Sequence, residues 1–386
     1  MDTSMNGPDM PVTSLFVEAP EGHGAPTSAA AVTLDLSVDA VTLTRALCDV
    51  PSPSGQEGPL ADAVEAALRG LGHLEVLRDG NAVVARTHLG RAERVVLAGH
   101  LDTVPVAGTL PTRLEGDGPD AVLHGRGTVD MKGGVAVALR IAATVPAPNR
   151  DLTFVFYDNE EVEASLNGLG RLAQHHLDWL VGDFAVLGEP SGAAVEGGCN
   201  GTLRVEVVTR GVAAHSARPW MGHNAVHASG EILDRLNRYT PREADVDGLV
   251  YREGLNAVGI RGGVAGNVIP DECVVTVNYR FAPDLTPEQA VQHVREVFDG
   301  YEVRVTDLAA GARPGLDRPA AAAFLAATGR PATPKYGWTD VSRFSSLGIP
   351  AVNFGPGDPS LAHRDDERVR AGDILDCERA LRGWLG

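Results

Sequence analysis

The chain has 386 residues, and its 44% hydrophobic and 22% charged residues are typical of ordinary folded proteins. A chain of this length predicts about two domains. The net charge of −18 and the presence of only two lysines, Lys132 and Lys335, argue against a nucleic-acid partner, because no basic stripe is left to neutralise phosphates. We expect no membrane partner either, since no apolar run approaches the length of a membrane span and the first residues lack the segments of a signal peptide.

The four cysteines are widely spaced and form no Cys-x-x-Cys pair. This spacing predicts neither a thiolate zinc site nor a disulfide framework. We therefore expect reduced thiols and a cytoplasmic location.

Residues 1–32 are rich in Pro, Gly, Ser, Thr and Ala, which predicts a disordered N-terminal extension. From there to residue 200, segments with helical spacing alternate with short apolar runs of strand character. This alternation predicts an α/β domain with a mainly parallel sheet. The expected helices cover residues 41–48, 59–71, 133–145 and 166–175, and the expected strands cover residues 74–77, 82–85, 95–98, 152–157 and 184–187.

The pattern changes near residue 201. A strand, a helix, two strands, a helix and a strand then follow one another, which is the order of a ferredoxin-like βαββαβ unit. Helix and strand alternate again at residues 319–327 and 351–354. We therefore expect a catalytic domain formed by residues 33–200 and 313–386, interrupted by an inserted smaller domain at residues 201–312.

The run RVVLAGHLDTVPV at residues 94–106 has strand character and leads into His100 and Asp102. On a backbone with period 2 the two side chains point to the same side, so Asp102 is placed to orient the His100 ring. A carboxylate that is hydrogen-bonded to the second ring nitrogen commonly orients a metal-binding histidine. Taken alone, however, a His-x-Asp tripeptide at the end of a strand is common by chance.

Five further polar residues lie in loops that follow predicted strands or in a Gly-rich turn. Each has an ordinary alternative when taken singly: a helix N-cap, a pair of surface charges, a turn, or part of a solvated charge run. Ligands of open α/β sheets bind at the carboxyl ends of the strands, and all these loops converge on that edge. The ordinary alternatives do not explain the convergence of Asp130, Glu160, Glu161, Glu189 and His363.

Two histidines and three carboxylates suffice for two metal ions that share one carboxylate, and zinc accepts this mixture of ligands. Two ions about 3.5–4 Å apart can share and deprotonate a water molecule. One neighbouring carboxylate must then remain free to act as the general base. The adjacent Glu160 and Glu161 suit this division of roles.

Five motifs resemble, in order and spacing, those of the di-zinc metallopeptidase family that includes carboxypeptidases, aminoacylases, acetylornithine deacetylases and succinyl-diaminopimelate desuccinylases. The motifs are GHLDTVPV, GRGTVDMKGG, FYDNEEV, LGEPS and AHRDDERV. The resemblance covers the chain from residue 34 to its end, including the inserted domain. It implies two Zn²⁺ per subunit, with Co²⁺ as an alternative metal. It also implies that the inserted domain is a lid or dimerisation domain through which a homodimer forms.

Carried over to the matching positions, the resemblance implies that Asp130 bridges the two zinc ions. His100 and Glu189 would complete one metal site, and Glu161 and His363 would complete the other.

The resemblance also implies catalytic roles outside the metal ligands. Asp102 would orient the ring of His100, and Glu160 would activate the water as general base and then protonate the leaving amine. His215, in GVAAHSARP, would reach the active site of the partner subunit and stabilise the oxyanion. Without the resemblance, His215 is better explained as a surface histidine in a polar loop.

Long runs such as GGVAGNVIPDECVVTVNYRFAPD are most similar to the desuccinylase branch of the family. That branch implies hydrolysis of N-succinyl-LL-2,6-diaminopimelate for lysine and cell-wall precursor synthesis. The substrate is an N-acyl amino acid dicarboxylate, and a guanidinium fork binds a carboxylate well. The residues expected to bind it are Asn267, Arg280, Arg218 and Thr339.

Two other functions stay open at this point. Another N-acyl amino acid deacylase, resembling acetylornithine deacetylase, or a dipeptidase would have the same metal ligands. An inactive relative used as a binding protein would have lost a ligand or the general base, and this sequence retains all of them.

Overall fold

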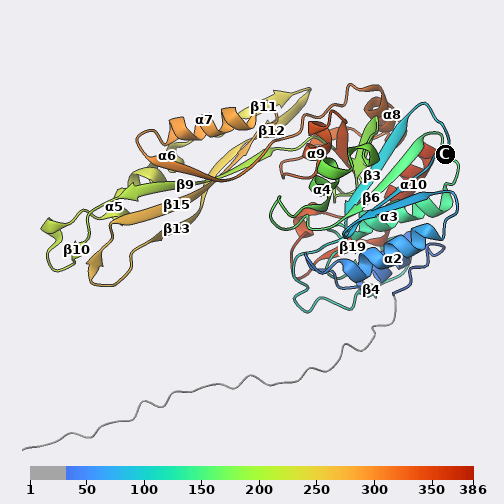
Figure 1. Ribbon diagram of the computed structural model, residues 1–386, viewed down its shortest axis with the longest axis horizontal. Coiled ribbons are helices and arrows are strands. Elements are labelled where there is room, and N and C mark those ends of the chain that lie inside the picture. The colour runs from blue at the N-terminus through green and yellow to red at the C-terminus, as the bar shows by residue number, and fades with distance from the viewer. Residues whose placement is uncertain (1–31) are drawn as a thin grey trace, which may run out of the picture. The chain divides into compact units, whose positions relative to one another are not determined.

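The computed structural model describes residues 32–386, and Figure 1 shows their helices and strands. The extension expected at residues 1–32 lies outside the described residues, except for Val32. Within the described part, the larger sheet has eight strands in the order β1-β2-β6-β3-β7-β18-β8-β17. These strands are β1 (Glu75–Asp79), β2 (Ala82–Arg86), β3 (Arg94–His100), β6 (Asp151–Tyr157), β7 (Phe184–Leu187), β8 (Val195–Gly197), β17 (Ala332–Pro334) and β18 (Ala351–Asn353).

The centre of this sheet is parallel. β3 pairs in parallel with β6 and with β7, and β7 pairs in parallel with β18. The pairs β1–β2, β2–β6 and β8–β18 are antiparallel, while β8–β17 is parallel. The predicted α/β class with a mostly parallel sheet is therefore confirmed. Because parallel strands end at the same edge, the loops after β3, β6 and β7 start side by side.

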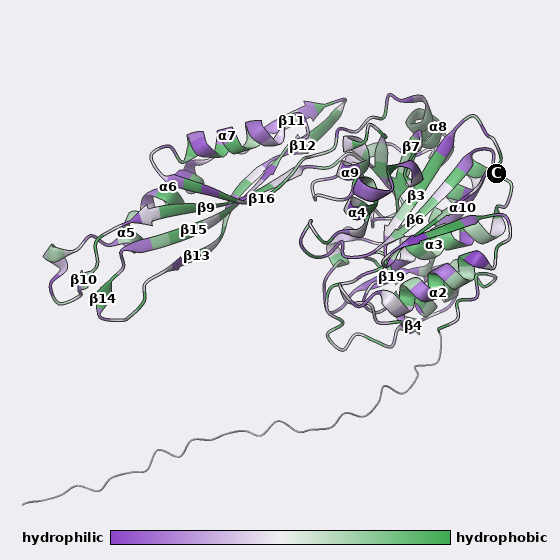
Figure 2. Ribbon diagram, in the orientation of Figure 1, coloured by the Kyte–Doolittle hydropathy of each residue, from purple (hydrophilic) through white to green (hydrophobic). Residues whose placement is uncertain are grey.

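Helices cover both faces of the larger sheet. Alternate residues of a strand point to opposite faces: Val95 and Leu97 of β3 belong to one hydrophobic core, and Val96 and Ala98 belong to the other. Figure 2 shows the hydrophobic character of β3 and β6 between these layers. The first core includes α1 (Ala40–Cys48), α2 (Gly58–Arg69), α3 (Lys132–Thr144), α8 (Pro319–Thr328) and α10 (Ala371–Leu385), and the second includes α4 (Gly168–His175) and α9 (Val341–Ser346).

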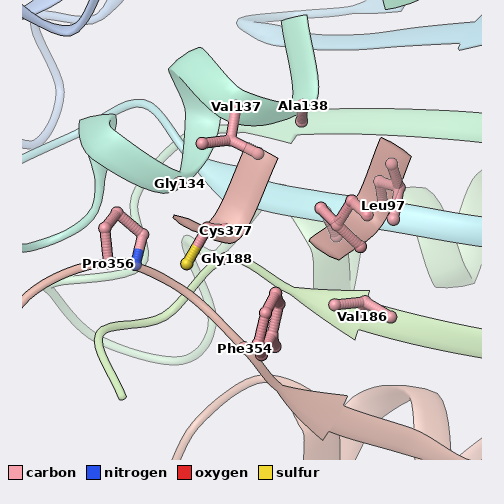
Figure 3. Close-up of a pocket in the computed structure, with 11 residues that line it drawn as sticks. Leu97, Gly134, Val137, Ala138, Val186, Gly188, Phe354, Pro356 and Cys377 are labelled. Atoms are coloured by element: carbon pink, nitrogen blue, oxygen red, sulfur yellow. The ribbon is translucent and has the colours of Figure 1, made fainter. Parts of the chain in front are cut away.

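Two glycines allow α3 to approach the end of β7 very closely. A Cβ atom added to Gly134 would lie 2.1 Å from the carbonyl oxygen of Gly188. The same carbonyl oxygen would lie 2.1 Å from a Cβ added to Gly355, which follows β18. Figure 3 shows Gly134 and Gly188 beside a small apolar cavity of about 10 Å³ that Val137 and Cys377 also line. Glycine is therefore required where these three backbones meet.

A second sheet, named the smaller sheet from here on, lies between residues 201 and 309. Its four strands are antiparallel, in the order β13-β15-β9-β16. Leu203 and Val205 of this sheet pack against Ile232 and Val294 of its helices. The first helix predicted after residue 201 is interrupted at Ser229 and forms two helices, α5 and α6. The elements are β9 (Gly201–Arg210), α5 (Ala225–Ala228), α6 (Gly230–Arg238), β13 (Gly254–Gly262), β15 (Glu272–Phe281), α7 (Pro287–Val297) and β16 (Glu302–Ala309).

Several short strands were not predicted, because strands of two to four residues are too short to show a clear period. They form a three-stranded sheet and two pairs among the described residues. These strands are β4 (Arg113–Glu115), β5 (Val122–His124), β19 (Arg368–Arg370), β10 (Ala214–His215), β14 (Val268–Ile269), β11 (Glu243–Val246) and β12 (Leu249–Arg252). In the part of the chain that the structure describes, no helix combines the length and apolar character needed to cross a membrane.

Candidate active site

His100 is the last residue of β3 and is fully buried. Its Nδ1 lies 2.9 Å from the main-chain oxygen of Asp102, and its Nε2 lies 3.1 Å from Oδ1 of Asp130. Burial alone would lower the pKa of His100, but the hydrogen bonds with Asp102 and Asp130 raise it well above its ordinary value. The ring is thus held on one side by the turn that follows β3, and its other nitrogen faces Asp130.

The Asp102 carboxylate holds the loop that carries the two glutamates. The backbone N–H groups of Glu160 and Glu161 donate to its Oδ1 and Oδ2, each at 3.0 Å. The Ser54 hydroxyl donates to Oδ2 at 2.7 Å, whereas Nδ1 of His100 is 3.5 Å from Oδ1. Burial would raise the pKa of Asp102, but the contact with His100 and these hydrogen bonds lower it to about 2. Asp102 is therefore a charged anchor for both glutamates as well as a neighbour of His100.

Asp130 lies between two imidazole rings. Its Oδ1 is 3.1 Å from Nε2 of His100, and its Oδ2 is 3.2 Å from Nε2 of His363. The N-cap residue of α3 is Met131, so Asp130 does not cap that helix. One carboxylate that faces both histidines has the arrangement that a bridging ligand needs.

His363 contacts a second carboxylate besides Asp130. Its Nε2 is 2.8 Å from Oε1 of Glu161, and the hydrogen bonds to Asp130 and Glu161 raise the pKa of His363 to about 10. The backbone φ of His363 is 65°, in the left-handed region that residues other than glycine seldom adopt. The loop therefore holds this histidine in a strained conformation beside the two carboxylates.

Glu160 and Glu189 bring two further carboxyl groups into the site. Burial, and then the charge of Asp130, raise the pKa of Glu189 to about 8. Burial raises the pKa of Glu160 well above its ordinary value; His100 opposes this shift, and the carboxylates of Asp340 and Glu189 add to it. Carboxylates that repel one another in this way form a site that a cation would stabilise.

The donor set fits a divalent metal. Ligand atoms of His100, Asp130 and Glu161 all lie within 4.8 Å of one another. One imidazole nitrogen and two carboxylate oxygens are ligands that zinc accepts. Glu189 and His363 line the same cavity as Asp130 and Glu161. The structure thus brings together all five residues that the family resemblance assigned to the metal ions.

An open cavity of about 440 Å³ lies over these residues. Residues 335–339 also line it and include Thr339, a predicted substrate-binding residue. The Thr339 hydroxyl is buried and donates to Oδ1 of Asn353 at 2.9 Å. Lys335 in the same wall pairs with Glu196 at 2.7 Å, so its charge is already neutralised.

A neighbouring cavity of about 840 Å³ shares Glu160, Glu161 and His363 with the first. Arg280, at the end of β15, lines this second cavity. The structure therefore places this predicted substrate-binding arginine in the same cavity as the candidate general base.

Three other predicted site residues lie near one another. Within the described residues 32–386, they line neither of the two cavities. β10, which ends in His215, pairs with β14, which follows Asn267. The backbone N–H of Ser216 donates to the carbonyl of Asn267 at 2.9 Å, and that of Arg218 donates to the carbonyl of His215 at 2.8 Å. His215, Arg218 and Asn267 are exposed and form one cluster at the separate two-stranded sheet of β10 and β14.

Sequence patterns missed several residues that support the site. Glu367 accepts the backbone N–H groups of Val129 and Asp130 at 3.0 and 3.2 Å, although AHRDDERV resembles a solvated charge run. Glu57 is buried and accepts the backbone N–H of Asn159 at 3.2 Å. The partners are far apart in sequence, so only the fold shows these contacts.

The model of the family described as peptidase family M20/M25/M40 matches residues 96–385. The chain is 57% identical, over 356 residues, to a Mycobacterium tuberculosis (strain H37Rv) protein provisionally named succinyl-diaminopimelate desuccinylase; the match covers 92% of this chain and 99% of that protein. It is 48% identical to the succinyl-diaminopimelate desuccinylase of Corynebacterium glutamicum, with 91% of this chain and 97% of the relative covered.

Among solved structures, a tripeptidase from Staphylococcus aureus has a similar fold. The TM-score is 0.73 at 19% sequence identity, and the match covers 92% of this chain and 98% of the tripeptidase. At this identity the likeness concerns the fold alone.

Proposed function

The chain belongs to peptidase family M20/M25/M40, and we propose from this that it hydrolyses the amide bond of N-succinyl-LL-2,6-diaminopimelate. The products are succinate and LL-2,6-diaminopimelate. LL-2,6-diaminopimelate serves lysine and cell-wall precursor synthesis. One observation carries this assignment: a chain that matches desuccinylases over almost its whole length gathers His100, Asp130 and Glu161 into one candidate metal cluster.

Two zinc ions are the cofactor that this proposal assigns to each subunit, with cobalt as an alternative. Asp130 would bridge them, His100 and Glu189 would hold one, and Glu161 and His363 would hold the other. The contacts of Asp130 with both histidines support this division. When bound, such a metal pair acidifies a water molecule and polarises the amide carbonyl.

Glu160 is the proposed general base. It lines the cavity beside Glu161 and Glu189, and it is the carboxylate of this group that the proposal does not assign to a metal ion, as a general base requires. Glu160 takes a proton from the attacking water and returns it to the amide nitrogen as the C–N bond breaks. Asp102 keeps Glu160 in place through the backbone N–H of that residue.

Residues 201–312 are proposed to form an inserted ferredoxin-like domain that mediates a homodimer, with residues 33–200 and 313–386 as the catalytic domain. The antiparallel order β13-β15-β9-β16 supports the ferredoxin-like assignment. The exposed cluster of His215, Arg218 and Asn267 supports a role towards a partner's active site, where His215 would stabilise the oxyanion and the other two would bind substrate.

Arg280 and Thr339 are proposed to bind the substrate in the chain's own cavities. A cytoplasmic location is proposed as well, and the four free, buried cysteines support it.

The activity is tested by incubating the purified, zinc-loaded protein with N-succinyl-LL-2,6-diaminopimelate and, in parallel, with N-acetyl-L-ornithine and a dipeptide series. We expect succinate release to have the highest kcat/KM. Efficient turnover of another substrate without succinate release would assign the chain to another acyl amino acid deacylase or to a dipeptidase.

A further inference from the structure

The two cavities beside the candidate metal site contain few cations to receive an anionic substrate. Lys335 pairs with Glu196 at 2.7 Å, and Arg343 pairs with the buried Asp340. Arg204 and Arg280 also line the larger cavity, and neither forms an ion pair with a carboxylate of residues 32–386. Among the arginines that line the larger cavity, Arg204 and Arg280 are therefore the ones whose charge remains available to bind an anionic substrate.

The register of the smaller sheet places both arginines on one face. Arg204 on β9 lies opposite Asn278 on β15, and Thr202 lies opposite Arg280. Arg204 and Arg280 are thus diagonal neighbours, at a separation that long side chains can span. The amide of Asn278 donates to the Thr202 hydroxyl at 3.2 Å, so the polar groups between the arginines are satisfied by each other.

The other face of these strands is apolar, which fixes the direction of the arginines. Leu203 and Val205 alternate with Thr202 and Arg204 and belong to the hydrophobic core of the smaller sheet. A rotation of β9 that turned Arg204 away from the cavity would expose that core. The fold thus commits Arg204 to the face that borders the active site.

The charge of Arg204 also acts on Arg280. Desolvation lowers the pKa of Arg280, and the charge of Arg204 lowers it further. Asp307, opposite Arg204 on β16, opposes this effect but forms no ion pair with either arginine among the described residues. Asp307 lines the same cavity, but two neighbouring guanidinium groups that form no ion pair still favour an anion between them, and a carboxylate matches their planar fork.

We propose that Arg204 binds substrate directly, as the partner of Arg280 in a two-arginine clamp for one substrate carboxylate. This inference rests on the proposed function, because a succinylated diaminopimelate carries several carboxylates. The chain's net charge of −18 makes a local clamp necessary, since the protein as a whole repels such a substrate. Arg204 therefore contributes to specificity for polycarboxylate amides.

The test compares Arg204→Gln and Arg204→Lys with the wild type on N-succinyl-LL-2,6-diaminopimelate. Loss of charge-assisted hydrogen bonds predicts a roughly ten- to hundredfold higher KM for Arg204→Gln, with little change in kcat, and partial recovery for Arg204→Lys. Arg261→Gln is the matched control, because Arg261 is an exposed arginine of the same sheet that pairs with Glu206 instead. An unchanged KM, or a lower kcat at constant KM, would overturn the proposal.

Calorimetric titration of succinate and of LL-2,6-diaminopimelate separates this inference from the assignment of the reaction. We expect Arg204→Gln to weaken the binding of at least one of these products by a similar factor. If Arg204→Gln binds a product more weakly than the wild type, but the wild type does not hydrolyse the amide, the proposed function fails and the clamp stands. If both proteins bind both products equally, the clamp fails whatever the reaction.

Discussion

Arg126 and Glu367 form a buried ion pair of 2.8 Å that joins the loop of Asp130 to the loop of His363. The Arg126 guanidinium also donates to the carbonyl of Pro105 at 3.1 Å and to that of Arg364 at 3.1 Å. One side chain thus connects the three loops that follow His100, contain Asp130 and contain His363. The pair thus links loops that carry proposed metal ligands, although neither Arg126 nor Glu367 is itself a proposed ligand.

Glu367→Gln should weaken both the fold and metal binding. The amide keeps an oxygen for the backbone N–H groups but leaves the buried Arg126 with only the exposed Asp365 carboxylate, 4.0 Å away, as a counter-ion. Loss of one partner of a buried ion pair costs about 3–5 kcal/mol. We expect a lower free energy of unfolding in denaturant titrations and fewer metal ions per chain by elemental analysis.

Glu253→Gln is the matched control for Glu367→Gln. Glu253 is equally buried and accepts hydrogen bonds from Arg242, Tyr279 and the backbone of Ala282, but it lies in the smaller sheet region. The Glu253→Gln substitution should destabilise the fold and leave the metal content unchanged. Equal metal loss in both variants would contradict a specific role for the Arg126–Glu367 pair.

Glu160→Gln should retain its metal and lose most of its turnover. Removal of a general acid–base group lowers the rate by roughly two to four orders of magnitude. The measurement is kcat together with metal content, with Glu288→Gln on the exposed first turn of α7 as the control. Near-wild-type turnover would remove Glu160 from this role.

His363→Ala should leave one of the two proposed metal positions weakly occupied. His363 is about half exposed, with 52% of its side chain accessible, so its removal should disturb the fold little. His100→Ala should also remove a metal ion but, because His100 is fully buried, should in addition destabilise the protein. Elemental analysis after dialysis measures the stoichiometry, and a full metal complement in His363→Ala would exclude it as a ligand.

Gly134→Ala should destabilise the protein by at least roughly 1–3 kcal/mol, because the new methyl group would overlap the carbonyl of Gly188. Gly383→Ala in α10 is the control, since an added Cβ there meets no atom within 4 Å. That change should be neutral or stabilise by up to about 1 kcal/mol. The thermal midpoint of unfolding should therefore fall in Gly134→Ala, and it should stay unchanged or rise in Gly383→Ala.

The sequence predicted the parts of the fold that depend on local patterns. Strands such as β3 and β6 are continuous apolar runs, and the polar residues that follow them identify the edge of the sheet where the site lies. It did not predict the ion pair between Arg126 and Glu367, whose partners are 241 positions apart. The anchoring of Glu160 by Asp102 was missed as well, because the sequence does not show which backbone N–H groups a carboxylate binds.

Metal-dependent succinate release tests the central claim most directly. The protein is depleted of metal with a chelator, and its turnover of N-succinyl-LL-2,6-diaminopimelate is followed while Zn²⁺ is titrated back. We predict that depletion abolishes turnover and that activity returns and reaches a plateau near two Zn²⁺ per chain. Full activity in the depleted protein, or no succinate release at any metal content, would contradict the account.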